Sequence, residues 1–225
     1  MNLIAYGIVF KAPQARCLWY IIGIHREASV NHNIKTPLGL KDVNKLRSGD
    51  TVLLSGIIYT GRDALHKFLF EAKASARLPV DLKGSVVYHC GPIVVKEGDG
   101  WRVAAAGPTT SYRTSPYISD IVRRYGVKAF IGKGGLSAEA SESLSKYGAV
   151  YLSAAGGCAQ VLAESIVKVL DVYYYKEFGP PEAVWKLEVK DFPLLVTIDT
   201  HGKDMHREVS SLSASKVAKA IKSRE

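Results

Sequence analysis

Residues 127–153, VKAFIGKGGLSAEASESLSKYGAVYLS, decide the fold class. The sequence pattern predicts a short strand over Val127–Ile131, a loop over Gly132–Gly135, a helix over Ser137–Tyr147 and a strand over Ala149–Ser153. Strands that alternate with helices are typical of a layered α/β domain. We therefore expect this central stretch to supply strands to a sheet on which helices pack.

The residues before this centre are rich in strand-forming side chains. Buried strands are predicted at Thr51–Tyr59 and Ser85–Cys90, and a hairpin is predicted from Ile93–Lys96, the turn Glu97–Gly100 and Trp101–Ala106. Between these strands, Asp63 should cap a helix over Ala64–Ala76, and Ser115 should cap a helix that starts at Pro116.

The residues after the centre return to strands. Gly156 and Gly157 are expected to open a third helix that runs to about Leu170. Val184–Val189 and Leu194–Asp199 are expected to form a closing strand pair. The order is β-rich, then alternating, then β again, which predicts an α/β domain with a mixed sheet.

Composition and charge narrow the classes of function. The chain has 225 residues, of which 47% are apolar, and its formal net charge is +9. A basic protein favours anionic partners, but the charge is scattered and no run of five like charges occurs. The densest basic stretch, Lys216 to Arg224, contains no aromatic residue, which argues against nucleic-acid binding.

The cysteines indicate neither a local metal site nor a disulfide framework. Cys17, Cys90 and Cys158 lie far apart, without a CxxC pair, so we predict no metal held by this chain. An odd number of cysteines without framework spacing fits a reducing cytoplasm, and we expect the protein to be cytoplasmic.

The first thirty residues leave two interpretations open. Asn2–Phe10 and Cys17–Ile24 are apolar, but neither run is long enough to span a bilayer, and no membrane partner is expected. They could form a first strand pair, or they could be a lead-in segment outside the fold. A secretory signal peptide is not indicated, because the start lacks positive charge and a clear cleavage site.

Three loops that follow predicted strands carry cations or hydroxyl groups. They are Tyr59–Asp63 (YTGRD), Gly107–Arg113 (GPTTSYR) and Gly132–Gly135 (GKGG). Ligands of α/β domains usually bind at such loops. Arg62, Arg113 and Lys133 would supply three positive charges, with the hydroxyls of Thr109, Thr110 and Ser111 as further donors, a set that suits a small dicarboxylate.

Each loop also has a plainer explanation. Arg62 and Asp63 could form an exposed ion pair or a cap, and the hydroxyl run could be turn chemistry. The GKGG loop could be a tight turn, and it is not a P-loop because the GxxxxGK[ST] frame is missing. Of the histidines, His66 falls in the first helix, whereas His201 and His206 are interpreted as solvated loop residues because no third metal ligand is evident.

Taken together, the loops resemble the β portion of class I fumarases and the related L(+)-tartrate dehydratases. The matching segments stand in the family's order and cover roughly residues 35–205: GDTVLLSGIIYTGRDALHKFL, AAAGPTTSYRTSPYISD, FIGKGGL, YLSAAGGCAQVLA and LLVTIDTHGKDMH. GPTTSxR followed about twenty residues later by GKGG is the most specific feature. Thr114 stands where the family commonly has methionine, and residues 1–30 show no counterpart in these motifs.

The resemblance implies a fold, a cofactor and a partner. It implies a swivelling β/β/α domain similar to the mobile domain of aconitases, over residues 31–207, with an N-terminal extension over 1–30 and a basic tail over 208–225. It implies a [4Fe–4S] cluster held by a separate α subunit and not by this chain, in a dimer of αβ heterodimers. The chain should therefore act only with its α subunit.

The resemblance also implies roles for particular residues. Arg62, Arg113 and Lys133 match positions that hold the substrate carboxylates, and Thr110 matches an adjacent substrate contact. Thr109 matches a hydroxyl placed at the reacting carbon, so Thr109 and Lys133 are the candidate catalytic residues. A threonine hydroxyl is a poor base unless neighbours activate it, and an acidic residue of the α subunit could do so.

The implied reaction is reversible hydration of fumarate to malate. Tartrate and mesaconate remain alternative substrates, because no residue marks the presence or absence of an extra hydroxyl. A regulatory or nucleic-acid-binding protein on the same fold is the alternative of another class. The presence of Arg62, Thr109, Arg113 and Lys133 together argues against it, since a decayed copy would be expected to lose at least one.

Overall fold

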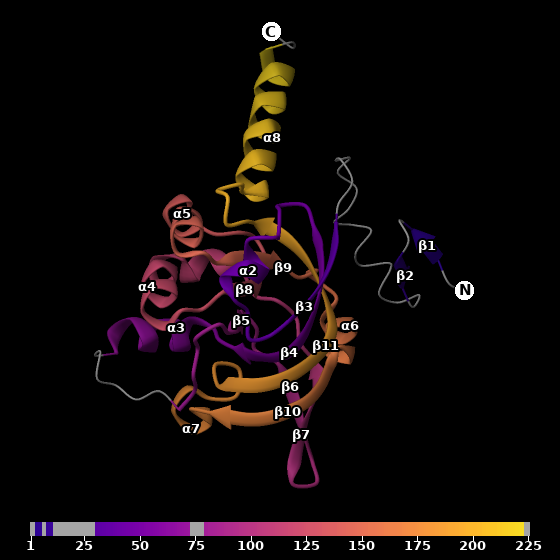
Figure 1. The fold of residues 1–225 in the computed structure, drawn as a ribbon, viewed down its shortest axis with the longest axis vertical. Helices are drawn as coiled ribbons and strands as arrows, with labels where there is room; N and C mark the ends of the chain where they lie inside the picture. Colours follow the sequence, from indigo (N-terminus) through magenta and orange to yellow (C-terminus); the bar gives the residue numbers. More distant parts are fainter. Residues whose placement is uncertain (1–2, 6–7, 11–29, 73–78, 223–225) are drawn as a thin grey trace.

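The main sheet closes into a five-stranded barrel. The structure is a computed structural model, and it describes residues 3–5, 8–10, 30–72 and 79–222. The ring consists of β4 (Thr51–Thr60), β5 (Val86–Tyr88), β8 (Ala129–Gly132), β9 (Val150–Ser153) and β11 (Val184–Ile198), as Figure 1 shows. It closes because β11 pairs with β9 on one side and with β4 on the other.

Strand directions confirm the predicted mixed sheet and the α/β class. β4, β5, β8 and β9 are parallel to one another, whereas β11 is antiparallel to both of its neighbours in the ring, β4 and β9. β3 (Asn31–Lys35) adds a parallel strand outside β4, and β10 (Ile166–Tyr173) adds an antiparallel strand outside β11. The swivelling β/β/α type stays a prediction.

Three helices lie side by side against one face of the parallel strands (Figure 1). They are α3 (Asp63–Glu71), α4 (Ser115–Tyr125) and α5 (Ala138–Tyr147). Their apolar sides bury Leu65, Ile118 and Leu144 against strand residues such as Phe130. Full burial stabilises the fold by about 1.5–3 kcal/mol for each such side chain.

The alternate residues of the same strands form a second core. Side chains from all five barrel strands contribute to it, among them Leu54, Tyr88 and Trp185. The indole Nε1–H of Trp185 donates to the carbonyl of Pro180 at 3.0 Å, so its polar atom is not left unpaired. The period-two alternation of a strand explains how one short strand serves both cores.

The remaining elements are short, apart from the last helix. They are the hairpin β6 (Ile93–Glu97) and β7 (Gly100–Ala105), the 3₁₀ turn η1 (Ser111–Thr114), and the helices α2 (Leu40–Val43), α6 (Ala159–Glu164) and α7 (Tyr175–Phe178). The last helix, α8 (Met205–Lys222), extends away from the body (Figure 1). None of the described helices combines the length and the apolar character needed to cross a membrane.

Only part of the first thirty residues is described. β1 (Leu3–Ala5) and β2 (Ile8–Phe10) form an antiparallel pair within the first apolar run. The second apolar run, Cys17–Ile24, lies outside the described residues. The domain boundaries at residues 30 and 207 stay predictions, although α8 already begins at Met205.

The predicted third helix is wrong in its extent. Helix α6 starts at Ala159 and ends at Glu164, and the chain then continues as strand β10. The segment IVKVLDVY is rich in β-branched residues, and β10 pairs with β11, so tertiary pairing prevails over helix formation here.

The predicted closing strand pair is also wrong, because its two halves belong to one strand. β11 runs from Val184 to Ile198 without interruption. Its pairing with β4 shifts register between Val189 and Phe192, where Asp191 adopts a φ of 50°. The bulge bends the strand, so its first half pairs with β10 and its second half with β9.

Both predicted helix caps are wrong by one residue. Asp63 is the first residue of α3 and Arg62 is its N-cap. Ser115 is the first residue of α4, and its Oγ instead accepts the backbone N–H of Ser137 at 2.9 Å. Helix α3 ends at Glu71, before the predicted Ala76, and residues 73–76 lie outside the described residues.

Candidate functional site

The predicted loops leave the barrel at a single edge. β4, β5, β8 and β9 are parallel neighbours, so the loops after their carboxyl ends share that edge. In open α/β sheets this is the edge at which ligands bind, and the same geometry applies to these four strands. The loop before η1 joins this edge, because Thr110 forms a parallel bridge with Lys133.

Arg62 is held at the start of α3 by an acidic residue. Its Nε lies 3.2 Å from Glu182 Oε1, and each side chain is 23% exposed. The other carboxylate oxygen of Glu182 accepts the backbone N–H of Ala64 at 3.0 Å, which supplies the cap that α3 needs. Arg62 Nε is buried and makes no hydrogen bond within the described residues, so the pairing is electrostatic.

Gly91 gives the Arg62 guanidinium its space. A Cβ added at Gly91 would lie 2.8 Å from Arg62 Nη1 and 2.7 Å from the carbonyl oxygen of Pro181. A larger residue at position 91 would therefore displace the guanidinium. The loop after β5 thus helps to place a cation that belongs to the loop after β4.

Arg113 connects the hydroxyl loop with the start of α3. Its Nη2 lies 2.9 Å from Asp63 Oδ2, and the two side chains are 52% and 45% exposed. Such a half-exposed ion pair contributes at most about 1 kcal/mol. An incoming carboxylate could replace Asp63 at small cost.

Lys133 is tied into the site by its backbone, while its side chain is exposed. Its N–H donates to the carbonyl of Thr109 at 3.2 Å, and its carbonyl accepts the N–H of Ser111 at 3.0 Å. Its Cδ lies 3.7 Å from the position of a Cβ at Gly156, so the GKGG loop and the loop after β9 touch. Among the described residues its ammonium group forms no ion pair, in contrast to Arg62 and Arg113.

The two threonines differ in how much of them a ligand can reach. Thr109 is partly buried, and both its N–H and its hydroxyl donate to the carbonyl of His89, at 2.7 and 3.0 Å. Thr110 is exposed. The Thr109 oxygen keeps its lone pairs for a further donor, but its own proton is directed at the protein.

Beneath these loops lies a buried polar array that we call the buried spine: His66, His89, Ser111 and Tyr151. His66 Nδ1 is 2.7 Å from the carbonyl of Arg62, and the two Nε2 atoms of His66 and His89 are 3.1 Å apart. His89 Nδ1 is 2.7 Å from Ser111 Oγ, to which the Tyr151 hydroxyl donates at 2.8 Å. All four side chains are fully buried.

Burial keeps the spine uncharged. It lowers the pKa of His66 to about 4 and that of His89 well below its usual value, the latter with further effects from His66 and Arg113. Burial also raises the pKa of the Tyr151 hydroxyl, and the neighbouring Ser111 and Gly135 oppose this rise. Both histidines are therefore neutral near pH 7.

His206 is placed differently from its prediction as a solvated residue. Its Nε2 lies 3.1 Å from Thr197 Oγ1 and 3.4 Å from Ser153 Oγ, and its ring packs against Gly135 of the GKGG loop. Burial lowers its pKa, and Asp204 opposes this. His201, by contrast, is exposed as predicted.

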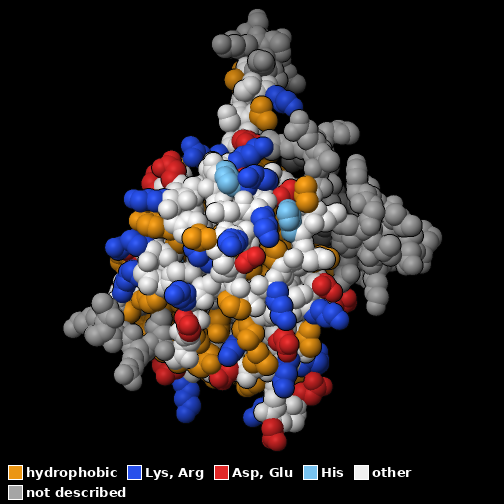
Figure 2. Space-filling model, in the orientation of Figure 1, with side chains coloured by type: hydrophobic (Ala, Val, Ile, Leu, Met, Phe, Trp, Pro, Cys, Tyr) orange, Lys and Arg blue, Asp and Glu red, His pale blue; other side chains and the backbone are white. Residues whose placement is uncertain are grey.

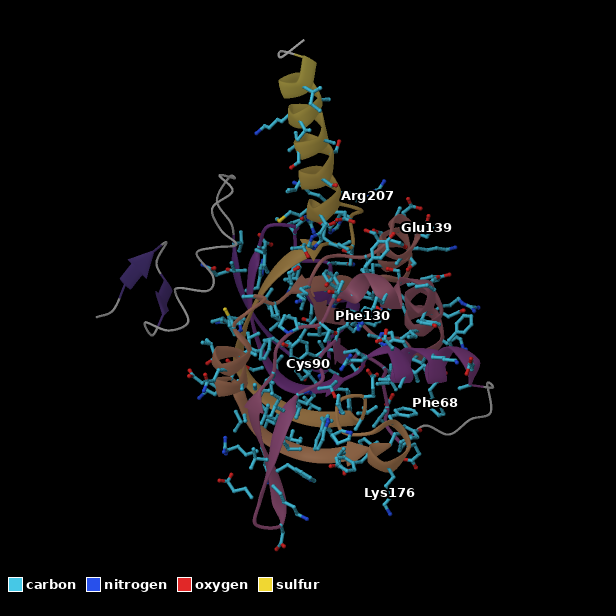
Figure 3. All side chains as sticks on the ribbon, turned by 180° about the vertical axis from the view of Figure 1, so that it is seen from behind. Phe68, Cys90, Phe130, Glu139, Lys176 and Arg207 are labelled. Carbon is cyan, nitrogen blue, oxygen red and sulfur yellow. The ribbon has the colours of Figure 1, made fainter. Side chains whose placement is uncertain are left out.

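The donor set does not fit a metal cluster. Within the residues that the structure describes, no group of three or more His, Cys, Asp or Glu side chains is placed to hold a metal ion. Cys90 lies in the interior (Figure 3), where burial raises its thiol pKa to about 12. A thiol that is so reluctant to ionise is a poor metal ligand.

The surface shows no concentrated basic patch on the face drawn in Figure 2. Lys and Arg side chains are spread over it with Asp and Glu between them. This agrees with the scattered charge of the sequence and gives no support to a nucleic-acid surface there.

The structure brings the predicted loops together and adds residues that the sequence motifs missed. Glu182 pairs with Arg62, whereas Asp63, which the sequence offered as a partner of Arg62, pairs with Arg113 instead. His66 and His89 tie the loops together from beneath, with Tyr151 at the other end of the array. One signal of this buried array was present in the sequence. His89 is a polar residue within the otherwise apolar predicted strand Ser85–Cys90, and a buried polar residue needs hydrogen-bond partners.

Comparison with known proteins gives consistent matches. Residues 10–209 match the family model described as Fumarase C-terminus, so the match starts inside the segment without recognised motifs. A protein of Geobacillus stearothermophilus, provisionally named fumarate hydratase class I, is 45% identical over 186 residues, which are 82% of this chain and 35% of that protein. The chain thus spans about a third of that relative.

Two further relatives have nearly the length of this chain. A protein of Methanocaldococcus jannaschii, provisionally named L(+)-tartrate dehydratase subunit beta, is 45% identical over 172 residues, covering 76% of this chain and 88% of that protein. The L(+)-tartrate dehydratase subunit beta of Escherichia coli K12 is 38% identical over 182 residues, covering 80% and 89%.

Proposed function

We propose a hydro-lyase function for this chain because it belongs to the fumarase C-terminus family. In this proposal the chain is the β subunit of a class I fumarase or tartrate dehydratase type enzyme. The observation that supports it is that the loops bearing Arg62, Arg113 and Lys133 are joined at one strand edge, by the bridge of Thr110 with Lys133 and by the pair of Arg113 with Asp63. We propose fumarate, hydrated reversibly to malate, as the substrate.

The three cations would bind the two carboxylates of the substrate. Arginine offers a planar fork that matches a carboxylate, and lysine adds a compact charge. Arg62, held by Glu182 and confined by Gly91, is the fixed member of this clamp. The exposed Lys133 ammonium is the member that has no ion pair among the described residues. The clamp would also stabilise charge that develops on the carboxylate in the transition state.

Thr109 would place its hydroxyl at the reacting carbon, with Thr110 as an adjacent contact. The Thr109 proton points at the carbonyl of His89, which cannot take it up. To remove a substrate proton, Thr109 would therefore have to turn its O–H toward a stronger acceptor. An acidic side chain of the partner subunit is the proposed acceptor.

The partner in this proposal is an α subunit that carries a [4Fe–4S] cluster. The names of the two full-length relatives as beta subunits support the existence of such a partner. Since the described residues do not fit a cluster, no step of the reaction is assigned to one on this chain. A cluster on the partner would supply Lewis-acid activation of the substrate hydroxyl or water. The swivelling domain type and an assembly of two αβ heterodimers belong to the same proposal.

Fumarate and tartrate are separated by one experiment. The chain is co-purified anaerobically with its α subunit, and hydration of fumarate, dehydration of L(+)-tartrate and hydration of mesaconate are measured, with the chain alone as control. Activity on fumarate in the complex only supports the proposal. Activity on tartrate or mesaconate but not fumarate would reassign the substrate. An iron-loaded complex that is inactive on all three would refute the hydro-lyase proposal.

A further inference from the structure

We propose that the buried spine is a positioning device that couples the three substrate-binding loops, so that its residues act on substrate binding without touching the substrate. The role in substrate binding rests on the proposed function, whereas the coupling of the loops does not.

The carbonyl of Arg62, at one end of the buried spine, determines which atom donates and which accepts in every hydrogen bond along it. The carbonyl of Arg62 can only accept, so His66 carries its proton on Nδ1 and, being neutral, presents a lone pair at Nε2. His89 must therefore donate from Nε2 and accept at Nδ1. Ser111 donates to that Nδ1 and accepts from the Tyr151 hydroxyl. His66, His89 and Ser111 thus each donate once and accept once along the array.

The spine touches each of the three loops. It bonds the backbone of Arg62 in the first loop, and Ser111 belongs to the second. The N–H of Ser111 also donates to the carbonyl of Lys133 in the third loop at 3.0 Å. The backbone carbonyl of His89 in addition holds the N–H and the hydroxyl of Thr109. One histidine thus bonds the second loop through its ring and through its backbone.

The GKGG loop is shaped around the spine. A Cβ at Gly132 would lie only 1.9 Å from Ser111 Oγ, and 2.9 Å from the Tyr151 hydroxyl. The first glycine of the motif therefore permits close approach to the spine. Lys133 follows directly, so the position of the spine determines where this lysine leaves the strand.

A packing role alone does not explain this arrangement. Four buried polar side chains cost free energy that apolar residues of similar size would not. A fully satisfied array offsets that cost and holds a single geometry, since displacement of one member leaves its neighbours unpaired. The partners of this array lie in the three loops, so that geometry is transmitted to Arg62, Thr109 and Lys133.

The first test is Ser111→Ala, which removes the central hydroxyl. The matched control is Ser143→Ala, which removes a buried hydroxyl that donates to Ala140 at 2.7 Å within α5. Amide hydrogen exchange of the full chain reports on the loops through the bonded N–H groups of Gly61, Thr109 and Lys133. We expect exchange at all three to be roughly tenfold faster in Ser111→Ala and unchanged in the control.

The hydrogen-exchange and kinetic results distinguish coupling of the loops from a role of the spine in substrate binding. Faster exchange confined to the second loop would overturn the coupling, whether or not the enzyme is active. In the assembled complex, Ser111→Ala should raise KM for the dicarboxylate by about tenfold or more, since small displacements of binding groups are costly. General destabilisation would lower the yield of active enzyme and leave KM unchanged, which would overturn the positioning role.

A second variant guards against misfolding of the first. Tyr151→Phe keeps the ring and removes only the terminal hydroxyl, and it should loosen the GKGG loop and raise KM in the same direction by a smaller factor. Histidine side-chain ¹⁵N NMR of the unaltered chain should show neutral His66 protonated at Nδ1 and neutral His89 protonated at Nε2. The opposite tautomers, or normal KM in both variants, would overturn the proposal.

Discussion

Replacement of Gly132 by alanine should destabilise the protein far more than an added methyl group usually does. The new Cβ would meet Ser111 Oγ at 1.9 Å, whereas ordinary contact begins at 3.4 Å, so one of them must move by about 1.5 Å (3.4 − 1.9). Such a movement breaks the bonds of Ser111 to His89 and Tyr151, which are 2.7 and 2.8 Å long. Two buried hydrogen bonds lost at about 2 kcal/mol each, less a gain of up to about 1 kcal/mol for removing a glycine, give a loss of roughly 3–4 kcal/mol.

Thermal unfolding measures this loss against a matched glycine. For a domain of this size, roughly 3–4 kcal/mol corresponds to a decrease in Tm of about 6–16 °C. Gly156→Ala is the control, because its Cβ would meet only Lys133 Cδ, at an ordinary 3.7 Å, and should change Tm by at most about 2 °C. If Gly132→Ala melts like Gly156→Ala, the contact between the GKGG loop and the spine is not as described.

Three further predictions test the clamp and the spine separately. Lys133 is exposed, so Lys133→Gln should change the free energy of unfolding by at most about 0.5 kcal/mol. It should nevertheless lower kcat/KM of the assembled enzyme by about a hundredfold. Unchanged turnover at low substrate concentration would show that Lys133 does not bind the substrate. Arg113→Gln breaks the half-exposed pair with Asp63, so the free energy of unfolding measured with denaturant should fall by no more than about 1 kcal/mol. Initial rates should show a KM raised by about tenfold or more, because the substrate carboxylate loses its arginine. A normal KM would contradict the role of Arg113 in substrate binding. The pKa of His66 is about 4 in the folded protein, below its usual value of 6.5, so the unfolded chain binds the proton at a higher pH than the folded protein does. The free energy of unfolding should therefore fall as the pH drops from 6.5 toward 4, by up to about 3 kcal/mol. Unfolding measured across this range should have a shallower pH slope in His66→Gln but not in His201→Gln, and equal slopes would place the titration elsewhere.

Local pattern predicted most of the elements because their causes are local. The strand at Ser85–Cys90 and the helix at Ser137–Tyr147 are marked by apolar period and by a capping serine whose Oγ accepts the N–H of Ala140. The closure of the barrel was not predictable in this way. It depends on β11 pairing with β4, more than a hundred residues away in the chain, and on a bend at Asp191, where the sequence pattern predicted a gap between two strands and not a bulge within one.

The candidate site shows the same difference between local properties, which the sequence reveals, and long-range contacts, which it does not. The cations of the candidate clamp were identified from residue type and loop position, both of which are local properties. Their partners were not, because Glu182 lies 120 residues after Arg62, and nothing near it in the sequence refers to that arginine. The spine was missed for a similar reason. His89 directly follows strand β5 and His66 lies in helix α3, and only the packing of α3 on the sheet brings their rings to a 4.8 Å centroid separation.

The partners of the two arginines make the proposed clamp asymmetric. Glu182 holds Arg62 through one oxygen and caps α3 through the other, so Glu182 cannot move away from Arg62 without leaving the N–H of Ala64 unpaired. Asp63 holds Arg113 in a pair whose two side chains are half exposed, and that pair can be exchanged at a cost of at most about 1 kcal/mol. We infer that a dicarboxylate would bind to an Arg62 that is already in place and would draw Arg113 away from Asp63. The second step neutralises one substrate carboxylate while it frees an acidic side chain next to Arg62. Selectivity for a dianion over a monoanion would then arise mainly at Arg113 and Lys133. Only a ligand with a second carboxylate can offset the loss of the Arg113–Asp63 ion pair by taking the place of Asp63.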